Sequence, residues 1–150
     1  MASDSSDKTY KPLQMDQTRL MRIDYEDGPY ISCVLEVFVL TERPPYEALS
    51  YCWTKAEATC EIRLNGHPVW VRPNLYDYLK VMYEERQTCW IFVDALCINQ
   101  EDGVEKGHQV KLMGQIYEHA EGVVAWLGAK MPELWAREGM AGMQWWSDLL

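Results

Sequence analysis

Acids and amides gather directly after an apolar segment in the second half of the chain. The letters WIFV read as a buried strand, and they are followed by Asp94, Asn99, Gln100 and Asp102, and then by Glu105. Polar side chains at the carboxyl end of a strand can meet a ligand without disturbing the core. A carboxylate placed there can stabilise an oxocarbenium-like transition state or orient water, so Asp94 and Glu105 are the candidate catalytic residues.

An amphipathic helix must hold the second half of this group in place. The pattern predicts a helix from Val104 to His119, capped by Asp102 or Gly103, with Glu105 in its first turn where the helix dipole favours an acid. Its predicted core-facing stripe is Val110, Met113, Ile116 and Tyr117. A second apolar strand, Val123 to Leu127, follows and completes a strand–helix–strand unit.

Alternating and turn patterns define the earlier elements. Thr18–Asp24 and Tyr30–Leu40 read as an antiparallel hairpin, and Tyr46–Tyr51 as a further strand. Cys60–Val71 reads as a second hairpin, because its Asn-Gly pair suits a type I′ turn. After Pro73, a helix with Asn74 as its cap is predicted to bury one face: Leu75, Tyr78, Leu79 and Met82.

Three strands separated by crossovers, at Tyr46, Trp90 and Val123, predict an α/β fold with a parallel central sheet, flanking helices and added antiparallel hairpins. Such a sheet would bring two strand ends together. The predicted ligand-binding residues are Ser50, Tyr51, Trp53, Asn99, Gln100, Asp102 and Gln109. Aromatic rings beside carboxylates and amides suit a sugar-nucleotide ligand, since rings stack a base and carboxylates hold ribose hydroxyls.

Each of these residues also has a structural interpretation. Asp94 could simply cap its loop by accepting backbone N–H groups, and Asn99 and Gln100 could fix the loop conformation. Glu105 could serve only the helix dipole, and Trp53, like the other tryptophans, could belong to the core. The sequence alone leaves both interpretations open.

Composition limits the classes of partner. A net charge of −9 opposes binding to nucleic acid. Five cysteines without a CxxC pair indicate free thiols in a reducing compartment, which points to the cytoplasm, and the three histidines form no metal-binding pattern. No apolar run reaches the length of a membrane span. Residues 1–16 are predicted to be a disordered tail and 17–150 a single domain that continues into further sequence.

Five motifs resemble one family in this order: RLMRID, YEALSYCW, the NG hairpin with PNLYDYL, WIFVDALCINQED, and EKGHQVKLMGQIYEHAEGVVAWLG. Together they resemble the HET (heterokaryon incompatibility) domain of filamentous fungi over residues 18–128. One departure is Thr54, where the family commonly has glycine. The resemblance implies a self/non-self recognition effector that triggers programmed cell death, with self-association or other death-signalling domains as partners.

The HET family is itself distantly similar to the TIR domain, a flavodoxin-like fold. That similarity implies a TIR/flavodoxin-like sheet here and NAD as a possible substrate of an oligomerisation-activated glycohydrolase. TIR-type enzymes use a glutamate near a tryptophan on a later helix, so Glu133 and Glu138, beside Trp135, are weaker alternatives to Asp94 and Glu105. No other cofactor is implied.

Overall fold

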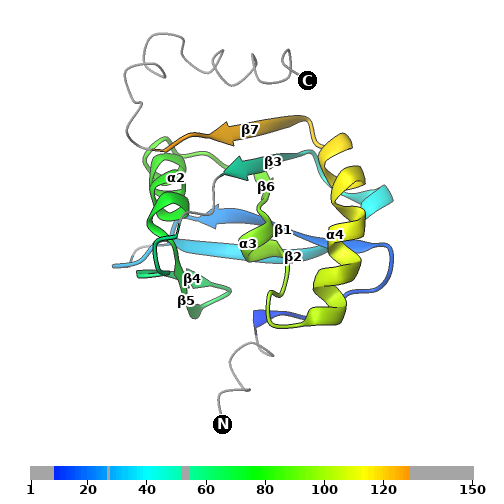
Figure 1. The fold of residues 1–150 in the computed structure, drawn as a ribbon. Helices are drawn as coiled ribbons and strands as arrows, with labels where there is room; N and C mark the ends of the chain where they lie inside the picture. Colours follow the sequence, from blue (N-terminus) through cyan, green and yellow to red (C-terminus); the bar gives the residue numbers. More distant parts are fainter. Residues whose placement is uncertain (1–8, 27, 52–54, 129–150) are drawn as a thin grey trace.

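A single seven-stranded sheet forms the centre of the protein. The computed structural model describes residues 9–26, 28–51 and 55–128. Its strands follow the order β5-β4-β2-β1-β6-β3-β7 (Figure 1). The elements are β1 (Gln17–Asp24), β2 (Ser32–Val39), the 3-10 turn η1 (Leu40–Glu42), β3 (Tyr46–Tyr51), β4 (Cys60–Leu64), β5 (His67–Val71), α2 (Pro73–Glu84), β6 (Trp90–Phe92), α3 (Asp94–Cys97), α4 (Gly103–Glu118) and β7 (Gly122–Trp126).

The sheet has a parallel part and an antiparallel part. β3 pairs in parallel with both β6 and β7, as the crossover pattern predicts. β1 and β2 form the predicted antiparallel hairpin, and β1 also runs antiparallel to β6, which joins the two parts. The α/β class, the parallel pairing of these three strands and the antiparallel hairpins are therefore confirmed. The parallel strands lie at one end of the sheet and not at its centre as predicted, because β1, which pairs antiparallel with β6, takes the middle position.

The β4–β5 hairpin turns as its sequence predicts. Asn65 has φ 51° and Gly66 has φ 80°, so both central residues adopt the positive φ that a type I′ turn requires. Asn65 also fixes the hairpin to β2, since its side chain accepts a hydrogen bond from the Leu35 N–H (2.8 Å) and donates one to the Leu35 carbonyl (3.1 Å). The hairpin then joins the sheet through parallel pairing of β4 with β2.

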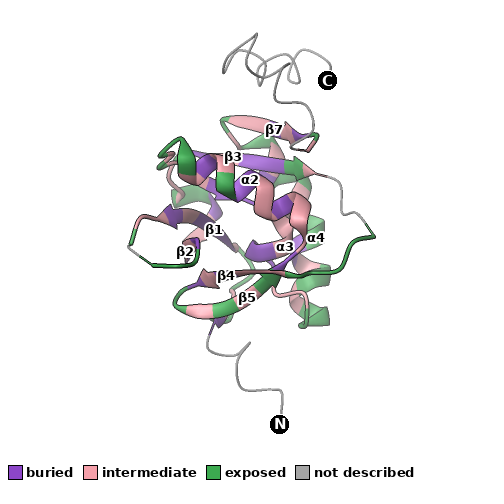
Figure 2. Ribbon diagram, turned by 90° about the vertical axis from the view of Figure 1, so that its left-hand side faces the viewer, coloured by how far each residue is buried: buried purple, intermediate pink, exposed green. Residues whose placement is uncertain are grey.

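The two long helices lie at opposite ends of the parallel strands. α2 lies where β3 and β7 end, and α4 lies where they begin (Figure 1). Tyr78 of α2 packs edge-on against Trp126, and Tyr117 of α4 packs edge-on against Phe92. β1 and β3 are largely buried, whereas β5 and the outer face of α4 carry exposed residues (Figure 2).

Several predicted details of the helices are wrong. α3 is a helix where a loop was expected, because Asp94 to Cys97 turn immediately after β6. The N-cap of α2 is Arg72 without a side-chain bond, since Pro73 occupies the first turn, and Asn74 instead accepts a bond from Trp126 Nε1 (3.1 Å). Leu75, Tyr78, Leu79 and Met82 are the buried face of α2, as predicted.

The core-facing stripe of α4 is partly different from the predicted one. Val110 is 52% exposed, and the buried residues of this helix are Gln109 and Ile116. An amide takes an inward position because it finds hydrogen-bond partners on β1, which an apolar pattern cannot reveal. The predicted capping residue of α4, Asp102, is confirmed, since its side chain accepts bonds from the N–H groups of Val104 and Glu105.

Part of the predicted tail, within the described residues, contacts the rest of the fold. Tyr10 donates a hydrogen bond to the Leu96 carbonyl (2.9 Å), and His108 Nε2 donates one to the Met15 carbonyl (2.8 Å). These contacts tie the segment before β1 to α3 and α4, so the packed part of the chain begins before residue 17. Among the described residues, no helix is long and apolar enough to cross a membrane.

Candidate functional site

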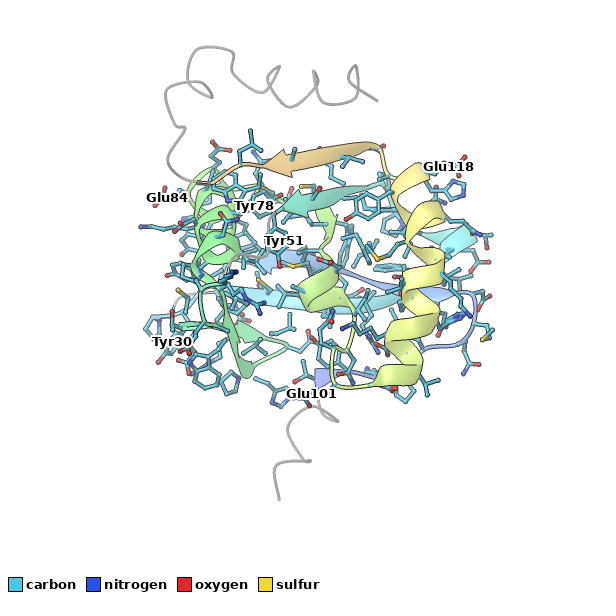
Figure 3. All side chains as sticks on the ribbon, in the orientation of Figure 1. Tyr30, Tyr51, Tyr78, Glu84, Glu101 and Glu118 are labelled. Carbon is cyan, nitrogen blue, oxygen red and sulfur yellow. The ribbon has the colours of Figure 1, made fainter. Side chains whose placement is uncertain are left out.

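The parallel strands bring several predicted site residues to one edge of the sheet. β3 ends at Tyr51 and β6 is followed by Asp94, and the two strands are neighbours in parallel register. Tyr51 lies between α2 and α3, near the centre of the molecule (Figure 3). The structure thus brings Tyr51 and Asp94, two of the predicted site residues, to the same edge of the sheet.

A pocket of about 570 Å³ opens at this edge. Three of the predicted site residues line it: Tyr51, Asn99 and Gln100. Its other lining residues are Thr9, Tyr10, Ala58, Pro68, Val69, Trp70, Val71, Arg72, Leu75, Ala95, Leu96, Glu101 and Lys106. The walls therefore come from α3 and its following loop, from β5 with the start of α2, and from the segment before β1.

Asp94 directly precedes Ala95, a lining residue of this pocket, but is not itself one of the lining residues. Its Oδ1 accepts a hydrogen bond from the Ala95 N–H (2.9 Å), and its carbonyl accepts one from Gln100 Nε2 (2.9 Å). Burial, and after it the nearby Asp94 carboxylate, raise the pKa of Tyr117 to about 12. The pKa of Tyr51 is also raised, first by burial and then by Asp94. Asp94 and these two phenols therefore share one electrostatic environment, in which the phenols stay neutral at physiological pH.

Glu105 forms a buried ion pair with Arg19 and is not one of the lining residues of the pocket. Both of its oxygens bond Arg19: Nη1 donates to Oε2 (2.9 Å) and Nη2 donates to Oε1 (2.6 Å). The side chains of Arg19 and Glu105 are only 2% and 10% exposed. Oε2 also accepts the Asn99 N–H (2.6 Å). Glu105 thus connects β1, α4 and the loop that carries Asn99.

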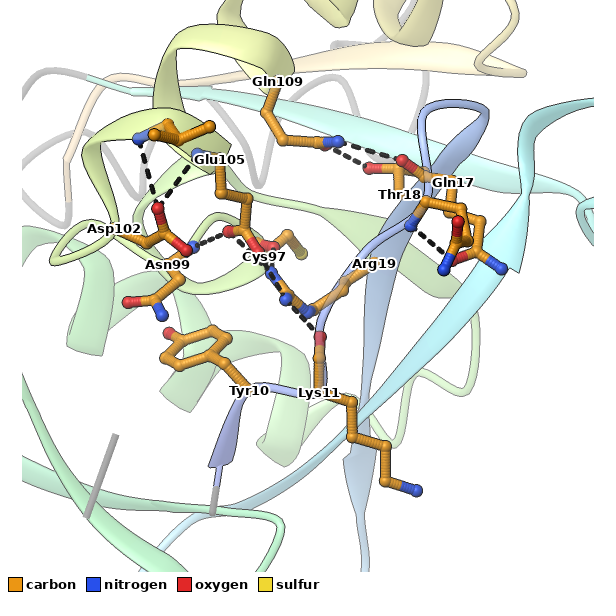
Figure 4. A network of polar contacts seen from close by, with 12 residues as sticks. Tyr10, Lys11, Gln17, Thr18, Arg19, Cys97, Asn99, Asp102, Glu105 and Gln109 are labelled. Carbon is orange, nitrogen blue, oxygen red and sulfur yellow. Dashed lines mark hydrogen bonds and ion pairs between the residues drawn. The ribbon is translucent and has the colours of Figure 1, made fainter. Parts of the chain in front are cut away.

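Arg19 ties together three segments around the pocket (Figure 4). Besides Glu105, its guanidinium donates to the carbonyls of Cys97 (3.1 Å) and Lys11 (2.6 Å). It also lies 4.9 Å from the centre of the Tyr10 ring, a cation–π contact. Arg19 therefore connects the segment before β1 with α3 and with α4.

The remaining predicted residues divide into two groups. Asp102 caps α4, and the buried Gln109 accepts a bond from the Thr18 hydroxyl (3.0 Å) and donates one to the Gln17 carbonyl (2.9 Å). Ser50 is exposed on β3 and pairs in register with Ala125, outside the pocket lining. Trp53, Glu133 and Glu138 fall outside the described residues.

Sequence reasoning missed Arg19 and most of the pocket lining, including Tyr10, Trp70 and Arg72. Arg19 sits in an alternating strand pattern, where a single charge normally faces solvent, and Tyr10 sits in the predicted tail. Trp70 and Arg72 belong to a hairpin and a helix start whose place beside α3 depends on the folded sheet. Only the RLMRID motif, through its Arg19, carried any signal. Within the described residues, no group of three or more His, Cys, Asp or Glu side chains could hold a metal ion.

Comparison with known proteins identifies the family. The family model for "Heterokaryon incompatibility protein (HET)" matches residues 46–146. The chain is 33% identical over 117 residues to heterokaryon incompatibility protein 6, OR allele, of Neurospora crassa, an alignment that covers 69% of this chain and 17% of that protein. No solved structure matches the chain. The match of more than half of its residues shows that this chain belongs to the heterokaryon incompatibility (HET) family.

Proposed function

We propose that this domain is an effector of heterokaryon incompatibility that triggers programmed cell death in the cytoplasm through self-association. The observation that carries the proposal is the HET match over residues 46–146, together with the relative named for heterokaryon incompatibility. Four described cysteines, Cys33, Cys60, Cys89 and Cys97, are free thiols, which fits a reducing compartment.

The polar contacts favour a recognition module over a catalyst. Glu105 uses both oxygens on Arg19, Asp102 caps α4, and Gln109 bonds β1. In these positions the acids and amides of the family motif hold elements together. A domain whose acids and amides are used in this way signals through contacts of its surface with other proteins and not through a reaction.

Two exposed apolar residues of α4 support self-association. Val104 is 86% exposed and Val110 is 52% exposed, both on one helix. Apolar side chains left in water favour contact with another surface. We propose that two copies contact each other through this helix.

Expression in a filamentous fungus tests this role. Cell viability is measured for the original chain and for Val104→Asp with Val110→Asp, and size-exclusion chromatography with light scattering gives the mass of each purified protein. We expect the double variant to lose both assembly and toxicity. Gln115→Asp adds one acid to an exposed position of the same helix and should change neither. Toxicity that persists in a variant shown to be monomeric would contradict the proposal.

A second candidate, TIR-like cleavage of NAD, is favoured by the pocket. The three parallel strands have the order β6-β3-β7, that is second, first, third along the chain, which is the order that starts a flavodoxin-like sheet. Asp94 lies beside Tyr51 and Gln100 at the end of these strands, where a sugar nucleotide would bind. In this mechanism the Asp94 carboxylate stabilises the developing positive charge on the ribose, and Asn99 and Gln100 orient the nucleotide.

Nicotinamide release from deliberately clustered protein distinguishes the two candidates. The enzyme hypothesis expects turnover that Asp94→Asn abolishes while thermal stability stays within about 1 kcal/mol of the original. Glu36→Gln, a distant exposed acid on β2, serves as the matched control. Absence of turnover would leave the signalling role alone, and equal turnover in Asp94→Asn would contradict the catalytic role given to Asp94.

A further inference from the structure

The pocket follows an edge strand of the sheet. β5 is the terminal strand in the described sheet order, and five consecutive residues from Pro68 to Arg72 line the pocket. We call the part of the pocket that runs along Pro68 to Arg72 the groove. Figure 2 shows β5 at the margin of the molecule, with exposed and half-buried residues along it.

The turn geometry fixes which backbone groups of β5 point away from β4. The two-residue Asn65-Gly66 turn makes Leu64 and His67 the hydrogen-bonded pair that closes the hairpin, and the pairs alternate from there. Glu61 and Trp70 therefore form a pair without mutual backbone bonds. The N–H and C=O groups of Trp70 consequently point outward from the sheet edge.

The neighbouring outward position limits where a partner strand can pair. Pro68 also belongs to a pair without mutual bonds, so its C=O points outward, but proline has no N–H to donate. Proline on an edge strand restricts unwanted pairing. The edge thus offers one donor and two acceptors, concentrated around Trp70.

The side chains along the groove define the chemistry of its occupant. Trp70 is 54% exposed, and the apolar residues Val69, Leu75 and Leu96 line the same groove. Arg72 and Lys106 supply two positive charges there against one negative charge on Glu101. This local excess of positive charge contrasts with the net charge of −9 for the chain.

We propose that an extended acidic peptide segment of a partner protein binds this groove by adding a strand to β5. The peptide forms main-chain hydrogen bonds with Trp70, places apolar side chains against Trp70 and Leu96, and places a carboxylate near Arg72 and Lys106. β5 has five residues, so the bound segment has a matching length. This interaction is separate from the α4 surface. It uses the same pocket as the NAD-cleavage candidate, so a bound peptide and a bound nucleotide would compete.

Fluorescence anisotropy with three labelled peptides tests the proposal on the 150-residue chain. The probe is an end-blocked heptapeptide of alternating valine and glutamate; the second peptide has lysine for glutamate, and the third is N-methylated at alternate backbone nitrogens. We expect the probe to bind one-to-one and each of the other two to bind about tenfold more weakly or less. Equal binding of the N-methylated peptide would overturn strand addition.

Protein variants locate the binding surface. Lys106→Glu should weaken the probe about fivefold or more, whereas Lys111→Glu, the same change on an exposed part of α4 outside the groove, should not. Trp70→Ala keeps the outward N–H, and Trp70→Pro removes it, so the proline variant should bind more weakly than the alanine variant.

Far-UV circular dichroism checks that each variant folds. If Trp70→Pro does not fold, the comparison with the N-methylated peptide still tests strand addition. Equal losses in Lys106→Glu and Lys111→Glu would overturn the assignment to this groove. The proposal would also be overturned if the chain forms dimers through β5 that the probe fails to dissociate. The groove would then be an interface between copies of the chain.

Discussion

The buried ion pair between Arg19 and Glu105 gives the sharpest prediction. Arg19→Met keeps the apolar length of the side chain but removes the guanidinium. Glu105, with a side chain 10% exposed, then has a buried charge without its partner, and the carbonyls of Lys11 and Cys97 lose their Arg19 donor. Breaking a buried pair in this way costs about 3–5 kcal/mol of stability. That is a large share of the roughly 5–15 kcal/mol that stabilises a typical domain.

Urea denaturation followed by circular dichroism measures this loss. Thermal denaturation gives a second measure. Each loss of 1 kcal/mol lowers the melting temperature of a domain of this size by roughly 2–4 °C, so the melting temperature of Arg19→Met should be roughly 6–20 °C lower. Arg22→Met is the matched control, because Arg22 is on the same strand, is partly exposed and lies over the Trp90 ring without a described ion pair. It should lose about 1 kcal/mol or less.

A double variant completes the test. Arg19→Met with Glu105→Met removes both charges, and its loss should be smaller than the sum of the two single losses. A loss below about 1 kcal/mol for Arg19→Met alone would refute the reasoning that this pair holds the walls of the pocket together. The same measurement decides how activity data are interpreted, since a Glu105 variant that loses activity together with stability carries no evidence for catalysis.

Two further predictions concern α4 and the buried thiols. Asp102→Ala removes the cap bonds to Val104 and Glu105 and should lower the free energy of unfolding by about 1 kcal/mol in the same urea assay. Asp77→Ala, inside α2, is the control because it removes no cap. Equal losses in the two variants would contradict the capping role. Burial raises the pKa of Cys97 from 9.0 to about 12 and therefore favours the neutral thiol in the folded state. This contribution to stability is complete below about pH 9 and is lost as the pH rises toward 12; a pH series of urea midpoints should show less of this fall in Cys97→Ala than in the original chain, and an identical fall would contradict it.

The sequence by itself determined the elements that depend on local patterns. The Asn65-Gly66 turn needs only two residues that tolerate positive φ, and Asp102 caps α4 through N–H groups two and three residues away. The buried face of α2 followed from helical spacing, and the parallel pairing of β3, β6 and β7 followed from the crossovers. The family motifs pointed to the same family that the comparisons identify.

Only the tertiary structure decided how the polar residues are used. Gln109 is buried because Thr18 and Gln17, about ninety residues earlier, satisfy its amide, and Arg19 is buried because Glu105 pairs with it. A local pattern cannot reveal such partners, since the cost of burying an amide or a charge depends on what lies opposite it in the folded chain. The same reason hid the groove, because Trp70 becomes part of it only when the sheet brings β5 beside α3.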